Sequence, residues 1–333
     1  MPQSPKLVTI FGGSGFVGRY IARRMAKEGW RVRVAVRRPN EAIFVRPYGV
    51  VGQVEPVLAN VRDDASVQAA VAGADAVVNC VSTLQEKGKQ TFEALNDEGA
   101  GRIARAAAEA GVAQLVHVSA LGADADSDSD SARTKAEGEA AVTAAFPNAM
   151  ILRPSVIFGN EDQFFNRFAD MSKLSPVMPL VGGASLFQPV YVDDVAQAAC
   201  MGAMGNANAG VYELGGPEVA SLSDFISKLL HIIRRRRLVL NLPFFVGTMM
   251  GKSFDLAQML SFGLFTNTIL TADQVKQLRN DNVVGDGAKT LADLGIQATS
   301  LDAVVDQYLY RHRPQGQYTE LTESAQLLNL ICR

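Results

Sequence analysis

The first 155 residues alternate between short apolar runs and longer stretches with the spacing of amphipathic helices. The apolar or alternating runs lie at 7–11, 31–36, 54–58, 76–80, 115–118 and 149–153, and the helical stretches lie at about 16–25, 64–72 and 91–110. Runs of this length, bounded by glycine or proline, predict strands. Strands that alternate with helices indicate a parallel sheet covered on both faces. We therefore expect an α/β fold with a Rossmann-type, doubly wound parallel sheet.

After about residue 155 this alternation ends. Glycine, proline and phenylalanine become frequent, as at 180–183 and 242–247, and Pro154 is expected to stop the last strand before the change. We expect residues 1–155 to form a dinucleotide-binding domain, joined by later strands from about 186–215. Residues 156–333 would form a smaller C-terminal lobe with segments that dock onto partners.

The bulk composition excludes several kinds of protein. The 32 basic and 34 acidic side chains nearly cancel, so no overall field favours nucleic acid as a partner. The three cysteines and three histidines are isolated, which argues against a zinc site, a disulfide framework or an iron–sulfur cluster. The acidic run at 124–130 lacks the glycine and final glutamate of a calcium loop and is expected to be a solvated surface loop, so no metal site is predicted. The first residues lack a signal-peptide layout, and no apolar run reaches about 18 residues, so we expect a soluble or peripheral protein.

Residues 12–18 read Gly-Gly-Ser-Gly-Phe-Val-Gly, directly after the first apolar run and at the start of the first helical stretch. Gly12, Gly15 and Gly18 have the spacing of a dinucleotide-binding turn. One glycine permits the tight turn, one lets backbone approach a pyrophosphate, and one lets helix and strand pack closely. The N-terminus of the helix adds unpaired N–H groups and a positive dipole for phosphate. The pattern predicts dinucleotide binding, and the alternative is a βα turn with a purely structural role.

The second predicted strand ends in Val36-Arg37-Arg38-Pro39. A site that prefers NAD usually places Asp or Glu near this point to hold the ribose hydroxyls, whereas arginine suits the 2′-phosphate of NADP. Arg37 and Arg38 therefore predict NADPH as the cofactor. The alternative is that both arginines are simply solvated at the end of a strand.

The chain resembles the extended short-chain dehydrogenase superfamily in two further stretches, 115–122 (LVHVSALG) and 191–196 (YVDDVA). The stretch 115–122 is similar to the fifth strand with the serine region of that superfamily. The stretch 191–196 is similar to the motif that anchors the C-terminal lobe in extended members.

A narrower resemblance extends from about residue 7 to about residue 313. The stretches 46–49 (RPYG), 157–166 (IFGNEDQFFN), 188–192 (QPVYV) and 291–299 (LADLGIQAT) are similar to the NADPH-binding accessory subunits of respiratory complex I, in their bacterial form. The stretches 157–166 and 291–299 are much more specific than a glycine turn.

The residues that this resemblance implies at the nucleotide are spread over the first 157 positions. They are Gly12, Gly13, Ser14, Gly15, Phe16, Val17 and Gly18 at the pyrophosphate, Arg37 and Arg38 at the 2′-phosphate, Asn60 and Val61 near the adenine, Ser82 and Ser119 beside the cofactor, Lys135 at the nicotinamide ribose, and Pro154 to Ile157 over the nicotinamide. Many superfamily members have aspartate at the position of Asn60, so the adenine contact departs from the usual pattern.

Hydride transfer to a carbonyl group needs an acid, a lysine that lowers the pKa of that acid, and a hydroxyl that polarises the oxygen. Lys135 is present, but Ser131 lies four residues before it, where a short-chain dehydrogenase carries its tyrosine. A serine hydroxyl is shorter and far less acidic than a phenol with a pKa of about 10. In extended members the working hydroxyl tends to lie one or two positions after Ser119, where this chain has Ala120 and Leu121. We expect no catalytic residue; the alternative for Lys135 is a solvated position on a helix.

Residues 231–265 join a basic cluster to an apolar segment. Four consecutive arginines at 234–237 precede the uncharged run 238–250, and apolar side chains continue to 265. Such a combination can lie at a membrane surface or cover a partner protein. The alternative is a buried C-terminal core with a solvated arginine turn.

The resemblance implies a non-catalytic, NADPH-holding accessory subunit of a proton-pumping NADH:quinone oxidoreductase. Such a subunit would stabilise or assemble the peripheral arm near the quinone site, on the cytoplasmic face of the bacterial inner membrane, with other complex I subunits as partners. Two alternatives stay open at this point. One is an independent NADPH-dependent reductase or sugar-nucleotide epimerase or dehydratase, and the other is a redox or nucleotide sensor that recruits a partner.

Overall fold

The computed structural model describes residues 5–83, 85–260, 271–318 and 324. Seven strands form one sheet in the order β11-β6-β5-β4-β1-β2-β3, and every neighbouring pair is parallel. They are β1 (Leu7–Phe11), β2 (Arg31–Val36), β3 (Val54–Leu58), β4 (Ala76–Asn79), β5 (Gln114–Val118), β6 (Met150–Pro154) and β11 (Gly210–Leu214). The predicted parallel sheet is confirmed, and the ends of the six predicted strands shift by no more than one residue.

One expectation at a strand end is wrong. Pro154 does not stop β6 from outside but is its last residue, opposite Leu214 of β11. Proline has no N–H to give to a sheet, but at a strand end it removes no more than one ladder bond. Its carbonyl oxygen still accepts a hydrogen bond from the backbone nitrogen of Leu121 at 2.9 Å.

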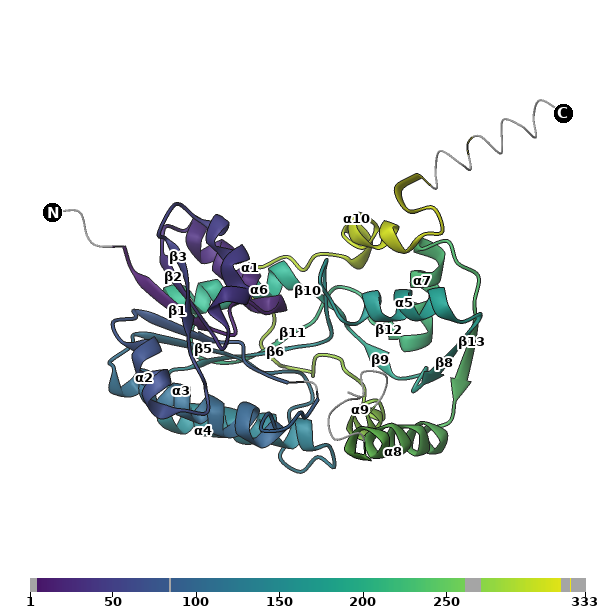
Figure 1. Cartoon of the computed structure of the whole chain (residues 1–333), viewed down its shortest axis with the longest axis horizontal. Coiled ribbons are helices and arrows are strands. Elements are labelled where there is room, and N and C mark those ends of the chain that lie inside the picture. Colours follow the sequence, from purple (N-terminus) through teal and green to yellow (C-terminus); the bar gives the residue numbers. More distant parts are fainter. Residues whose placement is uncertain (1–4, 84, 261–270, 319–323, 325–333) are drawn as a thin grey trace.

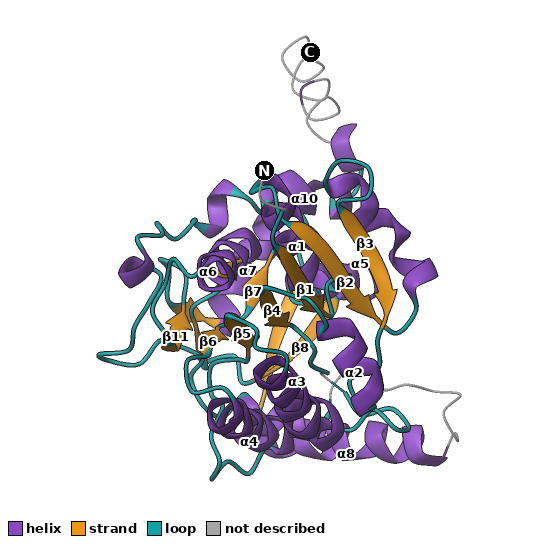
Figure 2. Cartoon of the chain, turned by 90° about the vertical axis from the view of Figure 1, so that its left-hand side faces the viewer, coloured by secondary structure: helices purple, strands orange, loops and turns teal. Residues whose placement is uncertain are grey.

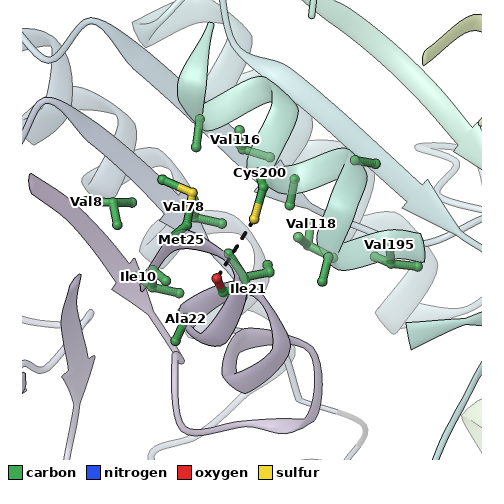
Figure 3. Close-up of a cluster of buried hydrophobic side chains, with 14 of the residues drawn as sticks. Val8, Ile10, Ile21, Ala22, Met25, Val78, Val116, Val118, Val195 and Cys200 are labelled. Carbon is green, nitrogen blue, oxygen red and sulfur yellow. Dashed lines mark hydrogen bonds between the residues drawn. The ribbon is translucent and has the colours of Figure 1, made fainter. Parts of the chain in front are cut away.

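Helices cover both faces of the sheet (Figure 1). α1 (Phe16–Lys27) and α6 (Val192–Met204) contact each other on one face, and α2 (Asp64–Val71), α3 (Glu98–Glu109) and α4 (Asp130–Ala145) follow one another on the other face (Figure 2). Figure 3 shows the core under the first pair, where Ile21 and Met25 of α1 and Cys200 of α6 pack against valines of the sheet. A second buried cluster, which includes Phe11 and Ile103, fills the opposite face. Burial on both faces explains why the strands are apolar throughout.

The connections between these elements include short, tighter helices. The 3₁₀ helix η1 (Pro39–Tyr48) links β2 to β3, and the π turn η2 (Glu93–Asp97) leads into α3. The stretch at 91–110 is therefore helical, as predicted, but it begins with a π turn.

The C-terminal lobe is built from small pieces around a third buried cluster. Pairs of short strands, β10 with β7, β12 with β9, and β13 with β8, take the place of a large sheet. The cluster includes Phe158, Phe165 and Phe225. The elements of this lobe are β7 (Ile157–Phe158), α5 (Phe165–Leu174), β8 (Val177–Val181), β9 (Leu186–Phe187), β10 (Val190–Tyr191), β12 (Ala220–Ser221), α7 (Leu222–Ile232), β13 (Leu238–Leu242), α8 (Phe244–Leu260), α9 (Ala272–Gln277), η3 (Ala292–Leu294), η4 (Leu301–Ala303), α10 (Asp306–Leu309), η5 (Tyr310–His312) and η6 (Gly316–Tyr318).

Among the described residues, no helix combines the length and the apolar character needed to cross a membrane. The expected docking segment 231–265 contains the end of α7, β13 and α8, while its residues 261–265 lie outside the described residues.

Candidate nucleotide-binding site

The glycine turn at 12–18 joins β1 to α1, and two of its glycines are required by the geometry. Gly12 has a φ of +73°, a left-handed conformation that favours glycine, and a Cβ there would lie 3.1 Å from the carbonyl oxygen of Cys80. A Cβ on Gly18 would collide with the carbonyl oxygen of Gly12. The first turn of α1 therefore packs directly onto the loop, as the spacing of the glycines predicts.

The N-terminus of α1 opens onto this loop without a side-chain cap. Gly15 is the N-cap residue and the first turn carries no acidic side chain. The first N–H groups of a helix have no carbonyl partner one turn earlier, so those of Phe16, Val17 and Gly18 are available to an anion. This is the arrangement that a pyrophosphate requires.

Arg19 braces the loop, and it was not among the residues predicted from the sequence. Its guanidinium donates to the carbonyl oxygens of Ser14 at 3.1 Å and Gly15 at 3.2 Å, and it lies 3.4 Å from the carboxylate of Glu161. The only signal for it in the sequence is a basic residue one turn into the helix, which is too common to point to a role.

The strand order reverses between β1 and β4, and the remaining candidate residues follow the carboxyl ends of the strands around this point. Arg37 and Arg38 follow β2, Asn60 and Val61 follow β3, Ser82 follows β4, and Ser119 follows β5. Because all these strands are parallel, their carboxyl ends meet at one edge of the sheet, where open α/β sheets bind ligands. The fold thus brings to one edge candidates that are spread along the chain from Arg37 to Ser119.

Three of these candidates have partners that hold the loops in place. Arg38 is exposed and lies 3.0 Å from Glu41. The side-chain oxygen of Asn60 accepts from the backbone nitrogen of Arg62 at 3.2 Å. The Ser82 hydroxyl donates to Asn96 at 3.1 Å.

Two polar groups at this edge lack such partners. The Ser119 hydroxyl is buried and has no hydrogen-bond partner among the described residues. Lys135, one turn into α4, is half-buried, and the described residues include no hydrogen bond or ion pair for its ammonium. A buried polar group without a partner is destabilising, so both groups fit a site completed by a polar ligand.

Burial and nearby charges act on the pKa of Lys135 in opposite directions, and burial has the larger effect. Burial lowers the pKa of Lys135, while the carboxylates of Asp273 and Glu139 raise it. His117 on β5 is buried, and burial followed by the charge of Lys135 lowers its pKa to about 4. The Nδ1 atom of His117 lies 3.1 Å from the amide nitrogen of Asn79. His117 is therefore neutral near pH 7 and donates no charge to the site.

The position of the missing acid lies on the first turn of α4. Ser131 is 4% exposed, and Ser129 is the N-cap of the helix. A serine side chain at this point reaches less far than a tyrosine and does not ionise near neutral pH. Across the described part of the chain, no group of three or more His, Cys, Asp or Glu side chains could hold a metal ion.

The stretch 157–166 attaches the C-terminal lobe to the glycine turn. Gly159 lies against Phe16, whose ring would be 3.3 Å from a Cβ at that position. Asp162 is buried and accepts backbone hydrogen bonds from Gly159 at 3.2 Å and Phe164 at 3.0 Å, and a third bond from the hydroxyl of Tyr308 at 2.6 Å. These contacts give the residues of the stretch 157–166 a structural role, because they join the C-terminal lobe to the glycine turn.

A second attachment joins α1 to α6. The guanidinium of Arg24 forms a bidentate pair with Asp193, with both distances 2.7 Å. Asp193 lies in the stretch 191–196 that resembles the lobe anchor, and its neighbour Asp194 accepts from the backbone nitrogen of Thr299 at 2.7 Å.

The basic and apolar parts of the segment 231–265 behave differently. Arg235 donates to the carbonyl oxygen of His312 at 2.9 Å, and Arg237 donates to that of Ser172 at 2.6 Å, so these arginines brace the lobe. The apolar side chains beside them are exposed, namely Leu238 at 65%, Leu240 at 48%, Phe245 at 72% and Met249 at 65%. We call these four residues the β13–α8 face. The alternative prediction for the segment 231–265, a buried C-terminal core, is therefore wrong for these four side chains.

Comparison with known proteins gives a consistent picture. An NAD(P)H-binding family profile matches residues 12–163. The chain is 34% identical over 316 residues to NADH dehydrogenase (ubiquinone) 1 alpha subcomplex subunit 9, mitochondrial, of Arabidopsis thaliana, covering 93% of this chain and 79% of that protein. It is 30% identical over 311 residues to the mitochondrial NADH-ubiquinone oxidoreductase 40 kDa subunit of Neurospora crassa, covering 93% and 80%.

Similarity to enzymes is shorter or more distant. The ceramide reductase of Caulobacter vibrioides is 34% identical over 190 residues, which is 57% of this chain and 58% of that protein. Among solved structures, the NADPH-dependent quinone oxidoreductase QOR2 of Escherichia coli, complexed with NADPH, has a TM-score of 0.70 at 20% identity, covering 91% of this chain and 99% of that one. At this identity the likeness concerns the fold alone.

Proposed function

The chain belongs to the family of the NADH dehydrogenase subunits named alpha subcomplex subunit 9 and 40 kDa subunit, and from this membership we propose that it is an accessory subunit of a proton-pumping NADH:quinone oxidoreductase. Its role is to hold NADPH without oxidising it, and thereby to stabilise or assemble the peripheral arm. One observation carries the non-catalytic part of this proposal. The chain has an intact glycine turn, but Ser131, rather than a tyrosine, lies four residues before Lys135 on α4.

Binding of a nicotinamide nucleotide is supported by the family match, and the preference for NADPH rests on Arg37 and Arg38. Arg37 is exposed at the end of β2 and makes no hydrogen bond or ion pair within the described residues. A guanidinium can bind a phosphate through two parallel N–H groups, whereas the hydroxyl of NADH offers no such partner. The glycine turn would bind the pyrophosphate, and Lys135 would hold the nicotinamide ribose.

A bound nicotinamide nucleotide supplies a hydride in reductases. The residues of this chain bind and orient the nucleotide, but Ser131 is too weak an acid to give a proton to a substrate oxygen. A nucleotide that binds only the folded chain still stabilises it. At a free nucleotide concentration of one hundred times the dissociation constant, the free energy of unfolding rises by about 2.7 kcal/mol. Such a subunit gains stability from NADPH without turnover.

We further propose that the chain docks on the peripheral arm near the quinone site, at the cytoplasmic face of a bacterial inner membrane. The names of the relatives support other complex I subunits as partners. The β13–α8 face supports a docking surface, since exposed apolar side chains that gather on neighbouring elements of the chain are typical of protein or membrane contact.

The direct test is to purify the chain from native membranes under mild detergent and identify what accompanies it. Stoichiometric flavin and iron–sulfur subunits are expected. A lone soluble oligomer that oxidises NADPH with a carbonyl compound would contradict the proposal.

A second candidate function is an NADPH-dependent reductase, which is favoured by the similarity to ceramide reductase over 190 residues. Lys135, which reductases of this fold also use, is compatible with it. Steady-state consumption of NADPH by the purified chain, abolished by Lys135→Met, would favour this candidate over the first.

A further inference from the structure

Residues 271–282, which include α9, lie against two elements of the predicted site, the first turn of α4 and the stretch 154–157. We propose that these residues are a strap that closes the substrate side of the pocket, with Asp273 as the positioning residue that holds the helix of Lys135. The proposal rests on the proposed function, since it supposes that the pocket holds a nicotinamide nucleotide.

One end of the strap, α9, is bound to the first turn of α4. The carboxylate of Asp273 accepts from the backbone nitrogen of Asp130 at 2.8 Å and from the hydroxyl of Ser129 at 2.9 Å. Gln277 donates to the same hydroxyl at 3.1 Å, and Lys276 donates to the carbonyl oxygen of Asp128 at 2.8 Å. The acidic loop at 124–130 is therefore not simply solvated, because its last three residues are held by α9.

The other end of the strap is bound to the stretch that we expect over the nicotinamide. The side-chain oxygen of Asn282 accepts from the hydroxyl of Ser155 at 2.6 Å and from the backbone nitrogen of Val156 at 3.2 Å. Ser155 and Val156 lie between Pro154 and Ile157. The strap thus contacts both walls that a substrate would have to pass between, α4 on one side and 154–157 on the other.

The strap is also in direct contact with the docking lobe. A Cβ on Gly251 of α8 would lie 2.8 Å from the backbone nitrogen of Ala272, so the backbones of α8 and α9 touch at this point. Figure 1 shows α9 between α8 and the sheet domain. The fold of the C-terminal lobe therefore sets the position of the strap.

Two features of the pocket agree with a closed substrate side. Ser131 is only 4% exposed, although it lies on the turn that a substrate carbonyl would have to reach. The charges that face Lys135 are Asp273 from α9 and Glu139 from its own helix, and the neutral His117 faces it from β5. The carboxylate of Asp273 thus brings a negative charge of the strap near Lys135.

Access to the nicotinamide can be measured on the full chain loaded with NADPH. A small water-soluble benzoquinone takes a hydride from NADPH and a proton from water, which gives the hydroquinone and NADP⁺, and the loss of NADPH fluorescence reports the rate. We expect slow oxidation in the parent chain and oxidation at least about ten-fold faster in Asp273→Ala, because the strap loses its bonds to α4. Asp286→Asn is the matched control, since Asp286 is exposed in the same lobe and makes no hydrogen bond or ion pair in the described structure.

A second readout separates positioning of Lys135 from a general loss of structure. An ammonium holds its charge below its pKa, so NADPH affinity is full at low pH and declines as the pH rises through that value. Asp273→Asn keeps the shape of the side chain but removes its charge, so the pKa of Lys135 falls and the decline moves to lower pH. His117 stays neutral above about pH 5 and does not contribute to this change.

The outcomes are distinguishable. Equal oxidation rates in the parent chain and Asp273→Ala, with NADPH bound to both, would overturn the strap and leave the proposed function standing. A parent chain that binds no NADPH at all would overturn both. If Asp273→Ala does not fold, Lys276→Met removes only the bond to Asp128 and is expected to raise the rate about three-fold, whereas an unchanged rate would count against the strap.

Discussion

The nucleotide edge of the sheet and the β13–α8 face differ in which side chains lack a partner. At the sheet edge these are buried polar groups, and on the β13–α8 face they are exposed apolar side chains. At the sheet edge, buried polar groups such as the Ser119 hydroxyl have no partner among the described residues, and two buried apolar clusters support the sheet beneath them. On the β13–α8 face, apolar side chains such as Phe245 are exposed on a lobe built from two-stranded sheets. The first arrangement calls for a small polar ligand, and the second calls for a large apolar surface.

This difference indicates that the two regions bind different kinds of partner. A buried polar group gains most from a ligand that matches its geometry, so the sheet edge is suited to one specific nucleotide. An exposed apolar face gains from area and tolerates variation, so the lobe is suited to a macromolecular partner. Variants at the two regions should therefore separate nucleotide binding from assembly, with the largest effect on nucleotide affinity at the glycine turn and the smallest at the β13–α8 face.

Gly18→Val should abolish NADPH binding. Any Cβ at this position collides with the carbonyl oxygen of Gly12, so α1 must move away from the turn that holds the pyrophosphate. We also expect a loss of roughly 2–3 kcal/mol in the free energy of unfolding, typical of overpacking. Fluorescence titration with NADPH and thermal denaturation check both effects.

The control is Gly111→Ala, at a glycine with a φ of +68° and open space around its Cβ position. It should cost about 1 kcal/mol of stability and leave NADPH affinity unchanged. Full affinity in Gly18→Val would contradict the role of the turn.

Arg37→Asp should weaken NADPH about one hundred-fold while changing NADH affinity little, because only NADPH has the 2′-phosphate. Competition titrations with the two nucleotides measure the ratio. Arg46→Gln, at an exposed arginine paired with Glu55, is the control for a general change of charge. Equal losses for NADPH and NADH would remove the argument for a phosphate site.

Lys135→Met should weaken NADPH about ten-fold without lowering the thermal denaturation midpoint of the nucleotide-free chain. Lys135 has no direct partner within the described residues, and burial disfavours its charged form, so its removal relieves the free chain and penalises only the complex. A lower midpoint in the absence of nucleotide would mean that Lys135 is instead a structural residue.

The double variant Phe245→Ser, Met249→Ser should leave NADPH affinity unchanged and abolish association with the respiratory complex. Both side chains are mostly exposed, so the free energy of unfolding should change by less than about 0.5 kcal/mol. Co-purification from membranes measures the association. Val51→Ser, at a fully exposed valine of the nucleotide domain, is the control, and a similar loss there would show that the β13–α8 face has no special role.

The sequence was sufficient for features that depend on neighbours in the chain. The strands, the glycine turn at 12–18 and the arginines after β2 follow from local patterns, and the structure reproduces their order. The pairing of the two-residue strands β7, β9, β10 and β12 was not predicted, because two residues are too few to produce a recognisable period.

Contacts between residues far apart in the chain could not be predicted from the sequence either. Asp273 binds Asp130 across 143 positions, and Tyr308 binds Asp162 across 146. The sequence around Asp273 has no feature that predicts a contact with α4, since this contact depends on how the C-terminal lobe packs against the sheet domain. For the same reason the end of the acidic loop at 124–130 was interpreted as solvated. Position 131 could be singled out because it lies four residues before Lys135, where the short-chain dehydrogenases that the chain resembles carry a tyrosine.

The most direct test of the central claim is to denature the complex purified from native membranes and to identify the nucleotide released from this chain by mass spectrometry. The sample should be taken before and after the complex has oxidised NADH in the presence of quinone. We predict one NADPH per chain, reduced in both samples, because no acid at position 131 supports its oxidation. An empty chain, or NADP⁺ that accumulates during turnover, would contradict the account.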